Sequence, residues 1–179
     1  MKIGFCGTMS VGKTTLVNAL KEQPEFKDYI FTTERSKYLR DLGIPLNTDS
    51  TLKGQVIFLA ERCSELLQPK IITDRTVIDV MAFTNASQSI PIRHADTYSD
   101  LALNFIKDYD YIFYISPEGV DMEDNGVRET DLKYRKKIDK EIKDIIEDNK
   151  HKIKNYVELS GTTEDRVKTV ISSIFHPYL

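Results

Sequence analysis

The clearest chemical signal lies near the start of the chain, in the stretch GTMSVGKTT at residues 7–15. Gly7, Gly12, Lys13 and Thr14 match the pattern G-x-x-x-x-G-K-[ST]. Its glycines let the backbone curl so that successive N–H groups face a phosphate, and the start of the following helix adds partial positive charge. The pattern predicts that Lys13 reaches the outer phosphates of a nucleoside triphosphate and that the Thr14 hydroxyl holds Mg²⁺. The candidates for binding the cofactor are Gly7, Thr8, Met9, Ser10, Val11, Gly12, Lys13, Thr14 and Thr15.

Phosphate-binding loops of this kind serve GTPase switches, motor ATPases and kinases, so the rest of the chain must separate these classes. A GTPase would carry the patterns D-x-x-G and N-K-x-D, and neither occurs in the sequence. A hexameric ATPase module needs a longer chain than 179 residues, with extra sensor elements. The sequence therefore favours a kinase, which requires a second carboxylate for Mg²⁺, an acceptor site and cations near the transferred phosphoryl group.

The second carboxylate is predicted in the stretch TDRT at residues 73–76, at the end of an apolar segment. Asp74 would hold Mg²⁺ through a water molecule or accept the proton of an attacking hydroxyl, and Arg75 would direct a cation into the same crevice. Open α/β sheets bind ligands at the carboxyl ends of their strands, which favours this interpretation. The alternative is that Asp74 only caps a helix starting near Thr76.

The acceptor site is predicted around Glu34, in the stretch TTERSKYLRDLG. Glu34 follows another apolar segment, where its carboxylate would hydrogen-bond an acceptor hydroxyl or act as a base. The alternative role for this carboxylate is to complement the dipole at the start of a helix. Lys37 and Gln55 are weaker candidates for contacts with the acceptor.

Two arginines are candidates for neutralising the transferred phosphoryl group. Arg128 and Arg135 lie in the stretch DNGVRETDLKYRKK, whose Asn-Gly pair is typical of a turn. Residues seven apart are two helical turns apart, so a helix here would present both arginines on one face. We expect a small lid over about 117–135 that brings them to the phosphates. The alternative is that both are ordinary solvated surface arginines.

The elements that position these residues are five short apolar segments separated by amphipathic helical patterns. The segments are KIGFC at 2–6, YIFTT at 29–33, KIITD at 70–74, YIFYIS at 111–116 and NYVELS at 155–160. Strands that alternate with helices indicate βαβ crossovers and a parallel sheet covered on both faces. The predicted fold is α/β, a three-layer P-loop NTPase fold with a five-stranded parallel sheet, in a single domain over 1–179.

The apolar spacing between these segments predicts helices and leaves two loops. One helical face is predicted to carry Leu52, Val56, Leu59, Cys63 and Leu66. Similar spacing predicts helices before the fourth strand, over 133–149 and near the C-terminus. The stretches 85–96 and 117–131 lack a clear period and are predicted to be active-site loops.

Composition limits the partners of this protein. The net charge of −3 provides no broad basic field, and acids alternate with bases over 133–149, so nucleic acid is a less favoured partner. Cys6 and Cys63 are too few for a disulfide framework and are expected to be buried, reduced thiols. No signal peptide or membrane-spanning apolar run is found, so we expect a cytoplasmic protein without a membrane partner. The expected oligomeric state is a monomer or a homodimer.

In this order the stretches resemble the P-loop nucleoside/nucleotide kinase superfamily, and most closely the AAA-type ATPase/kinase family related to the ribosylnicotinamide kinase domain. The resemblance rests on GTMSVGKTTLVNAL, TTERSKYLRDLG, GQVIFLAERCSEL, ITDRTVIDVMAFT and NGVRETDLKYRKKID. It implies a five-stranded parallel sheet, magnesium-ATP as donor and a small lid. SGTTEDRV is similar to the loop that packs on adenine in these kinases, which adds Gly161 and Thr162 to the cofactor-binding candidates. The family often has arginine at the position of Lys37, and the pair Asp74-Arg75 is more like that of thymidylate and deoxynucleoside kinases.

The predicted function is an ATP- and Mg²⁺-dependent kinase that phosphorylates a small nucleoside, a nucleotide or a close relative. The predicted catalytic residues are Lys13, Glu34, Asp74, Arg75, Arg128 and Arg135, and the predicted metal ligands are Thr14 and Asp74. One alternative is a kinase acting on a hydroxymethylated base in phage DNA, which requires a basic groove beside the crevice. An alternative of another class is a nucleotide-dependent regulatory ATPase or switch, in which Glu34, Asp74 and Arg75 would share no cavity.

Overall fold

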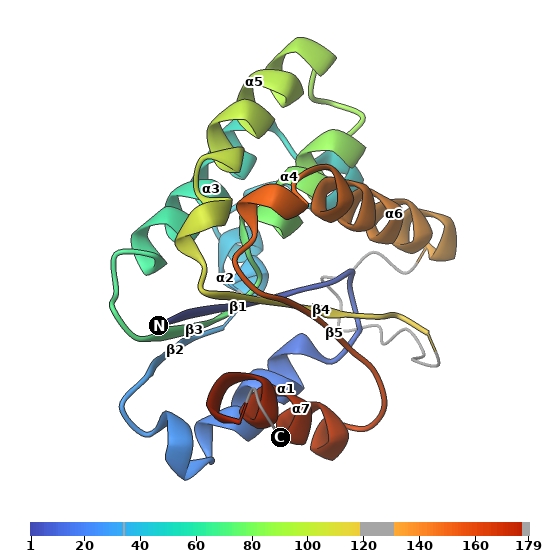
Figure 1. The fold of residues 1–179 in the computed structure, drawn as a ribbon. Coiled ribbons are helices and arrows are strands. Elements are labelled where there is room, and N and C mark those ends of the chain that lie inside the picture. The colour runs from blue at the N-terminus through green and yellow to red at the C-terminus, as the bar shows by residue number, and fades with distance from the viewer. Residues whose placement is uncertain (34, 119–130, 177–179) are drawn as a thin grey trace.

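The sheet at the centre of the molecule has five parallel strands, as the sequence predicts. The computed structural model describes residues 1–33, 35–118 and 131–176. Its strands are β1 (Lys2–Cys6), β2 (Ile30–Thr32), β3 (Ile71–Asp74), β4 (Tyr111–Ile115) and β5 (Tyr156–Leu159). They lie in the order β2-β3-β1-β4-β5, and every neighbouring pair is parallel. The predicted α/β fold class is therefore confirmed (Figure 1).

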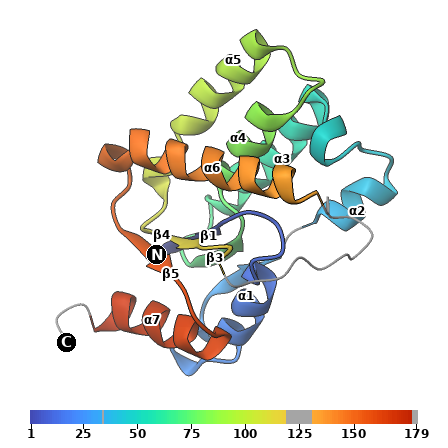
Figure 2. The ribbon, with the colours of Figure 1, turned by 90° about the vertical axis from the view of Figure 1, so that its right-hand side faces the viewer.

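Helices cover both faces of this sheet. They are α1 (Lys13–Lys21), α2 (Ser36–Asp41), α3 (Leu52–Glu65), α4 (Val77–Ala86), α5 (Ile92–Leu103), α6 (Leu132–Asp148) and α7 (Thr163–Phe175). Short 3-10 turns occur at Pro24–Phe26, Asn47–Asp49, Ile106–Asp108 and Lys150–Lys152. α1 and α7 lie side by side on one face, whereas α3, α4 and α6 lie on the other with α5 outside them (Figures 1 and 2).

The strands separate two apolar cores because their side chains alternate between the faces. On β4, Phe113 packs toward α1 and α7 together with Phe5 of β1, and their rings stack with centroids 5.3 Å apart. The next residue, Tyr114, belongs to the core under α4 and α6. A sheet buried on both faces in this way is a rigid support for the loops at its ends.

The register of the strands brings the segments that follow β1, β3 and β4 together at the carboxyl ends of the strands. Phe5 in β1 pairs with Asp74 in β3 and with Phe113 in β4. The chain leaves all three parallel strands in the same direction, so the segments that follow them lie next to each other. The sequence from Gly7 onward therefore begins beside Arg75, at the crevice where ligands of such sheets bind.

Two helical predictions need correction. The stretch 85–96, predicted as a loop, contains the end of α4 and the start of α5, so that only residues 87–91 connect helices. The start of α5 was missed because the buried position there is the small Ala95, which gives a weak apolar signal. Val56, predicted on the buried face of α3, is 51% exposed, because that face instead buries the polar side chains of Gln55 and Arg62.

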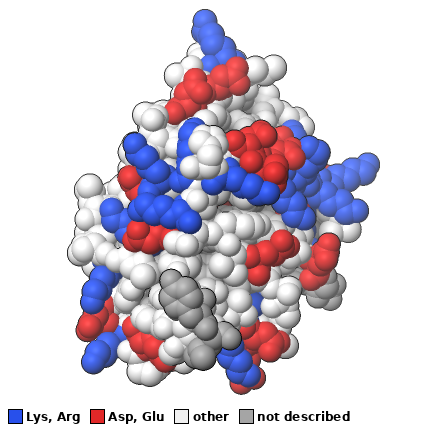
Figure 3. All heavy atoms as spheres, in the orientation of Figure 1, with Lys and Arg blue, Asp and Glu red and all other residues white. Residues whose placement is uncertain are grey.

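The surface is of mixed charge. On the face shown in Figure 3, Lys and Arg side chains gather over α6, with Asp and Glu side chains beside them. Lys140 pairs with Asp144, and the Lys143 ammonium lies 3.2 Å from the Asp139 carboxylate, as expected for a solvated helix face. Both cysteines are free thiols, as predicted. Cys6 is fully buried, but Cys63 is only partly buried, so the prediction of burial was wrong for Cys63. None of the helices that the structure describes is long and apolar enough to span a membrane.

Candidate functional site

The predicted phosphate loop, residues 7–15, curls between β1 and α1 in the way its glycines allow. Gly7 has φ +149° and Gly12 has φ +85°, both in the region that side chains rarely adopt. A Cβ on Gly7 would also lie 2.7 Å from the carbonyl oxygen of Ile115. Gly12 ends the loop as the left-handed residue directly before α1, so the first N–H groups of that helix have no partner within it. The loop therefore has the backbone shape that binds an anion at a helix N-terminus.

The ammonium group of Lys13 lies inside this loop. Its Nζ atom donates hydrogen bonds to the carbonyl oxygens of Gly7 at 2.6 Å and Thr8 at 2.8 Å. The residue is only 6% exposed, although lysine is rarely buried. The loop thus holds a positive charge at its centre, where an outer phosphate would be attracted.

Thr14 and Asp74 meet across the crevice, as the sequence predicts for a magnesium site. The Thr14 hydroxyl donates to Oδ2 of Asp74 at 2.5 Å. The other carboxylate oxygen, Oδ1, is buried without a hydrogen-bond partner among the described residues. Mg²⁺ prefers oxygen ligands and is usually held by one or two carboxylates together with substrate phosphates and water. A hydroxyl and a carboxylate with an unused oxygen fit that ion.

Asp74 is not the cap of the helix that follows it. α4 begins with a capping box in which Thr76 is the N-cap and the Asp79 carboxylate accepts the Thr76 N–H at 2.7 Å. Arg62 supports Asp74 from α3, where its Nη1 atom donates to the Asp74 carbonyl at 3.5 Å and its Nη2 atom donates to Glu65 at 2.7 Å. Burial raises the pKa of Glu65, and the Arg62 cation opposes that rise. The capping interpretation of Asp74 is therefore wrong, and its carboxylate is available to the crevice.

Asp79 is a site residue that the motif analysis missed. Its side chain is fully buried, and Oδ1 accepts the N–H of Gly7 at 3.2 Å while Oδ2 accepts the Thr76 hydroxyl at 2.9 Å. This one carboxylate joins the first glycine of the phosphate loop to the start of α4. The spacing of Thr76 and Asp79, which is that of a capping box, was the signal in the sequence.

Arg75 connects the phosphate loop with a second pocket. Its backbone has φ +104°, an uncommon conformation for a non-glycine residue, and its N–H donates to the Phe5 carbonyl at 3.1 Å. The guanidinium lies 4.8 Å from the centre of the Phe83 ring, within cation–π range. Arg75 lines both the crevice beside Lys13 and the pocket on its other side. Strained backbone of this kind is typical of functional sites.

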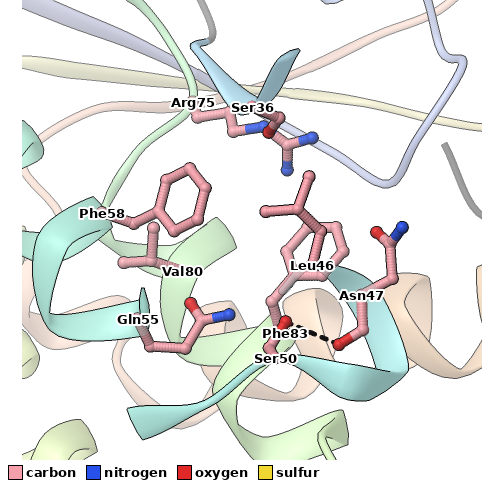
Figure 4. A pocket seen from close by; sticks show the side chains of 9 residues that line it. All are labelled: Ser36, Leu46, Asn47, Ser50, Gln55, Phe58, Arg75, Val80 and Phe83. Carbon is pink, nitrogen blue, oxygen red and sulfur yellow. Dashed lines mark hydrogen bonds between the residues drawn. The ribbon is translucent and has the colours of Figure 1, made fainter. Parts of the chain in front are cut away.

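The second pocket has about 350 Å³ of space, part of it open to solvent, and is formed by α2, α3, α4 and the loop before α3 (Figure 4). Its lining consists of Ser36, Leu46, Asn47, Ser50, Gln55, Phe58, Arg75, Val80 and Phe83. Figure 4 shows the Phe58 ring and the Gln55 amide, both from α3, and the Arg75 guanidinium, from the segment after β3, near the same region. The lining combines four apolar side chains with five polar ones, so both packing and hydrogen bonds are available to a small molecule.

The predicted acceptor residues are only partly tested by this arrangement. Gln55, a weaker candidate, lines the pocket and is 3% exposed. Lys37 is exposed, and the neighbouring Ser36 lines the pocket instead. Glu34 lies outside the described residues. Arg35 forms an ion pair with Glu61 of α3, with 3.1 Å between Nη1 and Oε1.

Of the two predicted arginines, Arg135 lies beside the phosphate loop. It is in the first turn of α6, is 7% exposed, and its carbonyl oxygen accepts the Thr8 hydroxyl at 3.1 Å. Residues 132–135, the last part of the predicted lid, thus belong to a helix that packs on α4. Arg128 and the central part of the lid, 119–130, lie outside the described residues, so the shared helical face of the two arginines stays a prediction.

The loop after β5 contains two further cofactor-binding candidates, Gly161 and Thr162, and it leads into the start of α7. Gly161 has φ +79°. Thr162 is the N-cap of α7, where its hydroxyl accepts the N–H of Asp165 at 3.2 Å and donates to the Asp165 carboxylate at 2.6 Å. Both hydrogen-bonding functions of the Thr162 hydroxyl thus serve the helix, and contact of Gly161 and Thr162 with the cofactor stays a prediction.

Comparisons with known proteins agree with this fold. A family model described as an AAA domain matches residues 2–166 of the chain. No curated protein matches it in sequence. The deoxyadenosine kinase from M. mycoides with bound dCTP has a similar structure, with a TM-score of 0.68, 19% identity, and coverage of 97% of this chain and 98% of that one. The NadR protein in complex with NR is also similar, with a TM-score of 0.69 and 15% identity, and the match covers 95% of this chain and 50% of NadR.

Proposed function

The chain belongs to the AAA domain family, and on that basis we propose that it is a kinase that transfers the outer phosphoryl group of magnesium-ATP to a hydroxyl of a nucleoside-like molecule. The observation that carries this proposal is the position of Arg75. It lines both the crevice at the phosphate loop and the pocket beside it, so a donor and an acceptor would meet at one guanidinium. Two adjoining compartments of this kind are what phosphoryl transfer requires, because catalysis depends on placing both reactants.

Each residue of the donor side has a role in this proposal. Lys13 and the loop N–H groups hold the outer phosphates, and Thr14 with Asp74 holds Mg²⁺. When bound, Mg²⁺ neutralises charge on the phosphates and orients them. Arg75 and Arg135 supply further positive charge as the phosphoryl group moves.

Proton transfer completes the proposed reaction. A hydroxyl oxygen of the acceptor forms a bond to the outer phosphorus, and the bond from that phosphorus to the bridging oxygen breaks, which leaves ADP. The hydroxyl proton goes to a carboxylate, either Glu34 or Asp74. Asp74 lies in the crevice lined by Lys13 and Arg75, and Glu34 is proposed for this role from the sequence alone.

The lining of the pocket supports a nucleoside-like acceptor. The rings of Phe58 and Phe83 offer an apolar surface for a flat base, and the Gln55 amide can both donate and accept hydrogen bonds. Arg75 is the only charged side chain among the residues described as lining this pocket, which favours a neutral nucleoside over a nucleotide as acceptor. The similar structures, a deoxyadenosine kinase and NadR with NR, support the same class.

The other two interpretations receive less support. A kinase for a base in DNA requires a basic groove beside the crevice. Arg135, Lys136, Lys140 and Lys143 line a pocket along α6, but its charge is reduced because Lys140 and Lys143 are paired with Asp144 and Asp139. A switch or regulatory ATPase needs no acceptor pocket, and Glu34, Asp74 and Arg75 would not then share a cavity. Of these three, Asp74 and Arg75 line one crevice, and Arg75 also lines the pocket beside it, whereas Glu34 lies outside the described residues.

A screen for acceptors tests the proposal. The protein is incubated with magnesium-ATP and with nucleosides, nucleoside monophosphates or hydroxymethylated oligonucleotides, and phosphorylated products are identified by mass spectrometry. We expect product from at least one nucleoside, and a fall of about 10-fold or more in kcat/KM in Gln55→Leu, because a lost base hydrogen bond in such a site typically costs that much. Gln68→Leu, the same change at an exposed position beyond α3, is the control. ATP turnover without any phosphorylated acceptor would refute the kinase proposal.

A further inference from the structure

Arg166, near the start of α7, is a buried cation that none of the roles above uses. It is 6% exposed, and its Nη1 atom donates to the carbonyl oxygen of Val11 in the phosphate loop at 2.7 Å. A Cβ on Gly12 would lie 3.2 Å from the same nitrogen, so the guanidinium packs directly against the last glycine of the loop. Burial lowers the pKa of this guanidinium, which still remains charged at neutral pH.

The start of α7 fixes this side chain in place. Gly161, in its left-handed conformation, turns the chain directly after β5, and the capping box of Thr162 and Asp165 sets the first turn of the helix. The N–H of Arg166 donates to the Thr162 carbonyl at 3.0 Å, so Arg166 sits in that first, doubly capped turn. α7 lies against α1, whose N-terminus is the end of the phosphate loop (Figures 1 and 2).

The peptide that Arg166 holds joins Val11 to a glycine, Gly12. In a trans peptide the N–H points opposite to the carbonyl, so a Val11 carbonyl directed at α7 turns the N–H of Gly12 away from α7. Glycine tolerates many backbone conformations, so the Val11–Gly12 peptide could flip at little cost. A flip would replace the Gly12 N–H by a carbonyl oxygen, which repels a phosphate.

We propose that Arg166 is a positioning residue for the donor phosphates, because its hydrogen bond to Val11 keeps the Gly12 N–H turned toward the phosphate. The inference rests on the proposed function only in that the loop binds a phosphate. The guanidinium acts from the side of the loop away from the phosphate, through the peptide. A hydrogen bond from a charged donor is strong enough that its loss should weaken phosphate binding by about 10- to 100-fold.

Inorganic tripolyphosphate with Mg²⁺ is the probe, because its binding requires neither an acceptor nor transfer. Calorimetry measures its Kd in the wild type, Arg166→Met, Arg166→Lys and the control Lys168→Met, which removes an exposed charge from the same helix. Proton–nitrogen NMR follows the Gly12 amide in the same titrations. We expect Arg166→Met to bind tripolyphosphate about 10- to 100-fold more weakly than the wild type. We also expect its Gly12 amide signal to lose the change in chemical shift that tripolyphosphate causes in the wild type. Arg166→Lys, which keeps a cationic donor, should recover most of both, and Lys168→Met should match the wild type.

Two outcomes would overturn the inference. One is a wild-type Kd in Arg166→Met. The other is that Arg166→Met and Arg166→Lys weaken tripolyphosphate binding equally while the Gly12 amide shows the same change in chemical shift as in the wild type. That result would mean that the two variants lost only packing. If the wild type binds tripolyphosphate as expected but phosphorylates no nucleoside, the proposed function fails and the role of Arg166 stands.

Discussion

Replacing Asp74 by asparagine separates charge from shape at the proposed magnesium site. Asp74 is 1% exposed, one of its oxygens accepts the Thr14 hydroxyl at 2.5 Å, and the other has no hydrogen-bond partner among the described residues. In Asp74→Asn the amide oxygen can still accept from Thr14, so the fold should be kept. The second oxygen becomes an NH₂ group, which donates hydrogen bonds and cannot bind a cation or its water.

The size of the effect follows from the interaction that is lost. A hydrogen bond to a charged group contributes about 1.5–3 kcal/mol, and each 1.36 kcal/mol is tenfold in rate, so kcat should fall by about 10- to 150-fold. Binding of ATP without Mg²⁺ should change little, because Lys13 and the loop N–H groups hold the phosphates.

The assay measures kcat against Mg²⁺ concentration for the wild type, Asp74→Asn and Asp96→Asn, an exposed carboxylate on α5 that serves as control. We expect Asp74→Asn to need more Mg²⁺ for half-maximal activity and to reach a lower plateau, while Asp96→Asn matches the wild type. An unchanged plateau and an unchanged Mg²⁺ requirement in Asp74→Asn would refute the assignment of this carboxylate to the metal.

Three further changes test other parts of the site. Lys13→Ala should unfold on heating as cooperatively as the wild type. It should reduce the rate of phosphoryl transfer by several orders of magnitude, because the positive charge inside the phosphate loop is lost. Wild-type turnover in this variant would contradict the assignment of the loop. Asp79→Asn should lower Tm and weaken ATP binding together, because the carboxylate joins Gly7 to Thr76, and a change in only one of the two would contradict that link. Arg128→Ala should lower kcat more than it weakens ATP binding, as a contact that strengthens in the transition state requires, and equal effects on both would count against it.

The sequence predicted the sheet and the phosphate loop well because both depend on local patterns. Each strand is a short apolar run rich in β-branched and aromatic residues, and the loop requires glycine at fixed positions. The proximity of Thr14 and Asp74 could also be predicted, since the strand ends of a parallel sheet converge and Asp74 ends its strand. Gly7 and Arg75 are close because they follow β1 and β3, which are neighbouring parallel strands.

The parts that were missed depend on tertiary contacts. Gln55 and Arg62 are polar residues that replace Val56 on the buried face of α3, because one lines the pocket and the other bonds to the Asp74 carbonyl. The spacing of apolar residues cannot identify buried positions that are occupied by polar side chains. Arg166 contacts Val11 across 155 residues, and no local pattern indicates a contact of that separation.

The central claim is that the donor and the acceptor bind in adjoining compartments that meet at Arg75. A bisubstrate compound, in which a nucleoside that the screen identifies is joined through its acceptor oxygen to the phosphate chain of ATP, would occupy both at once. Calorimetry should show that it binds at least about 100-fold more tightly than ATP or the nucleoside alone, as expected for two linked ligands, and that Arg75→Met reduces this gain. Binding no tighter than that of ATP, with no effect of Arg75→Met, would contradict the claim.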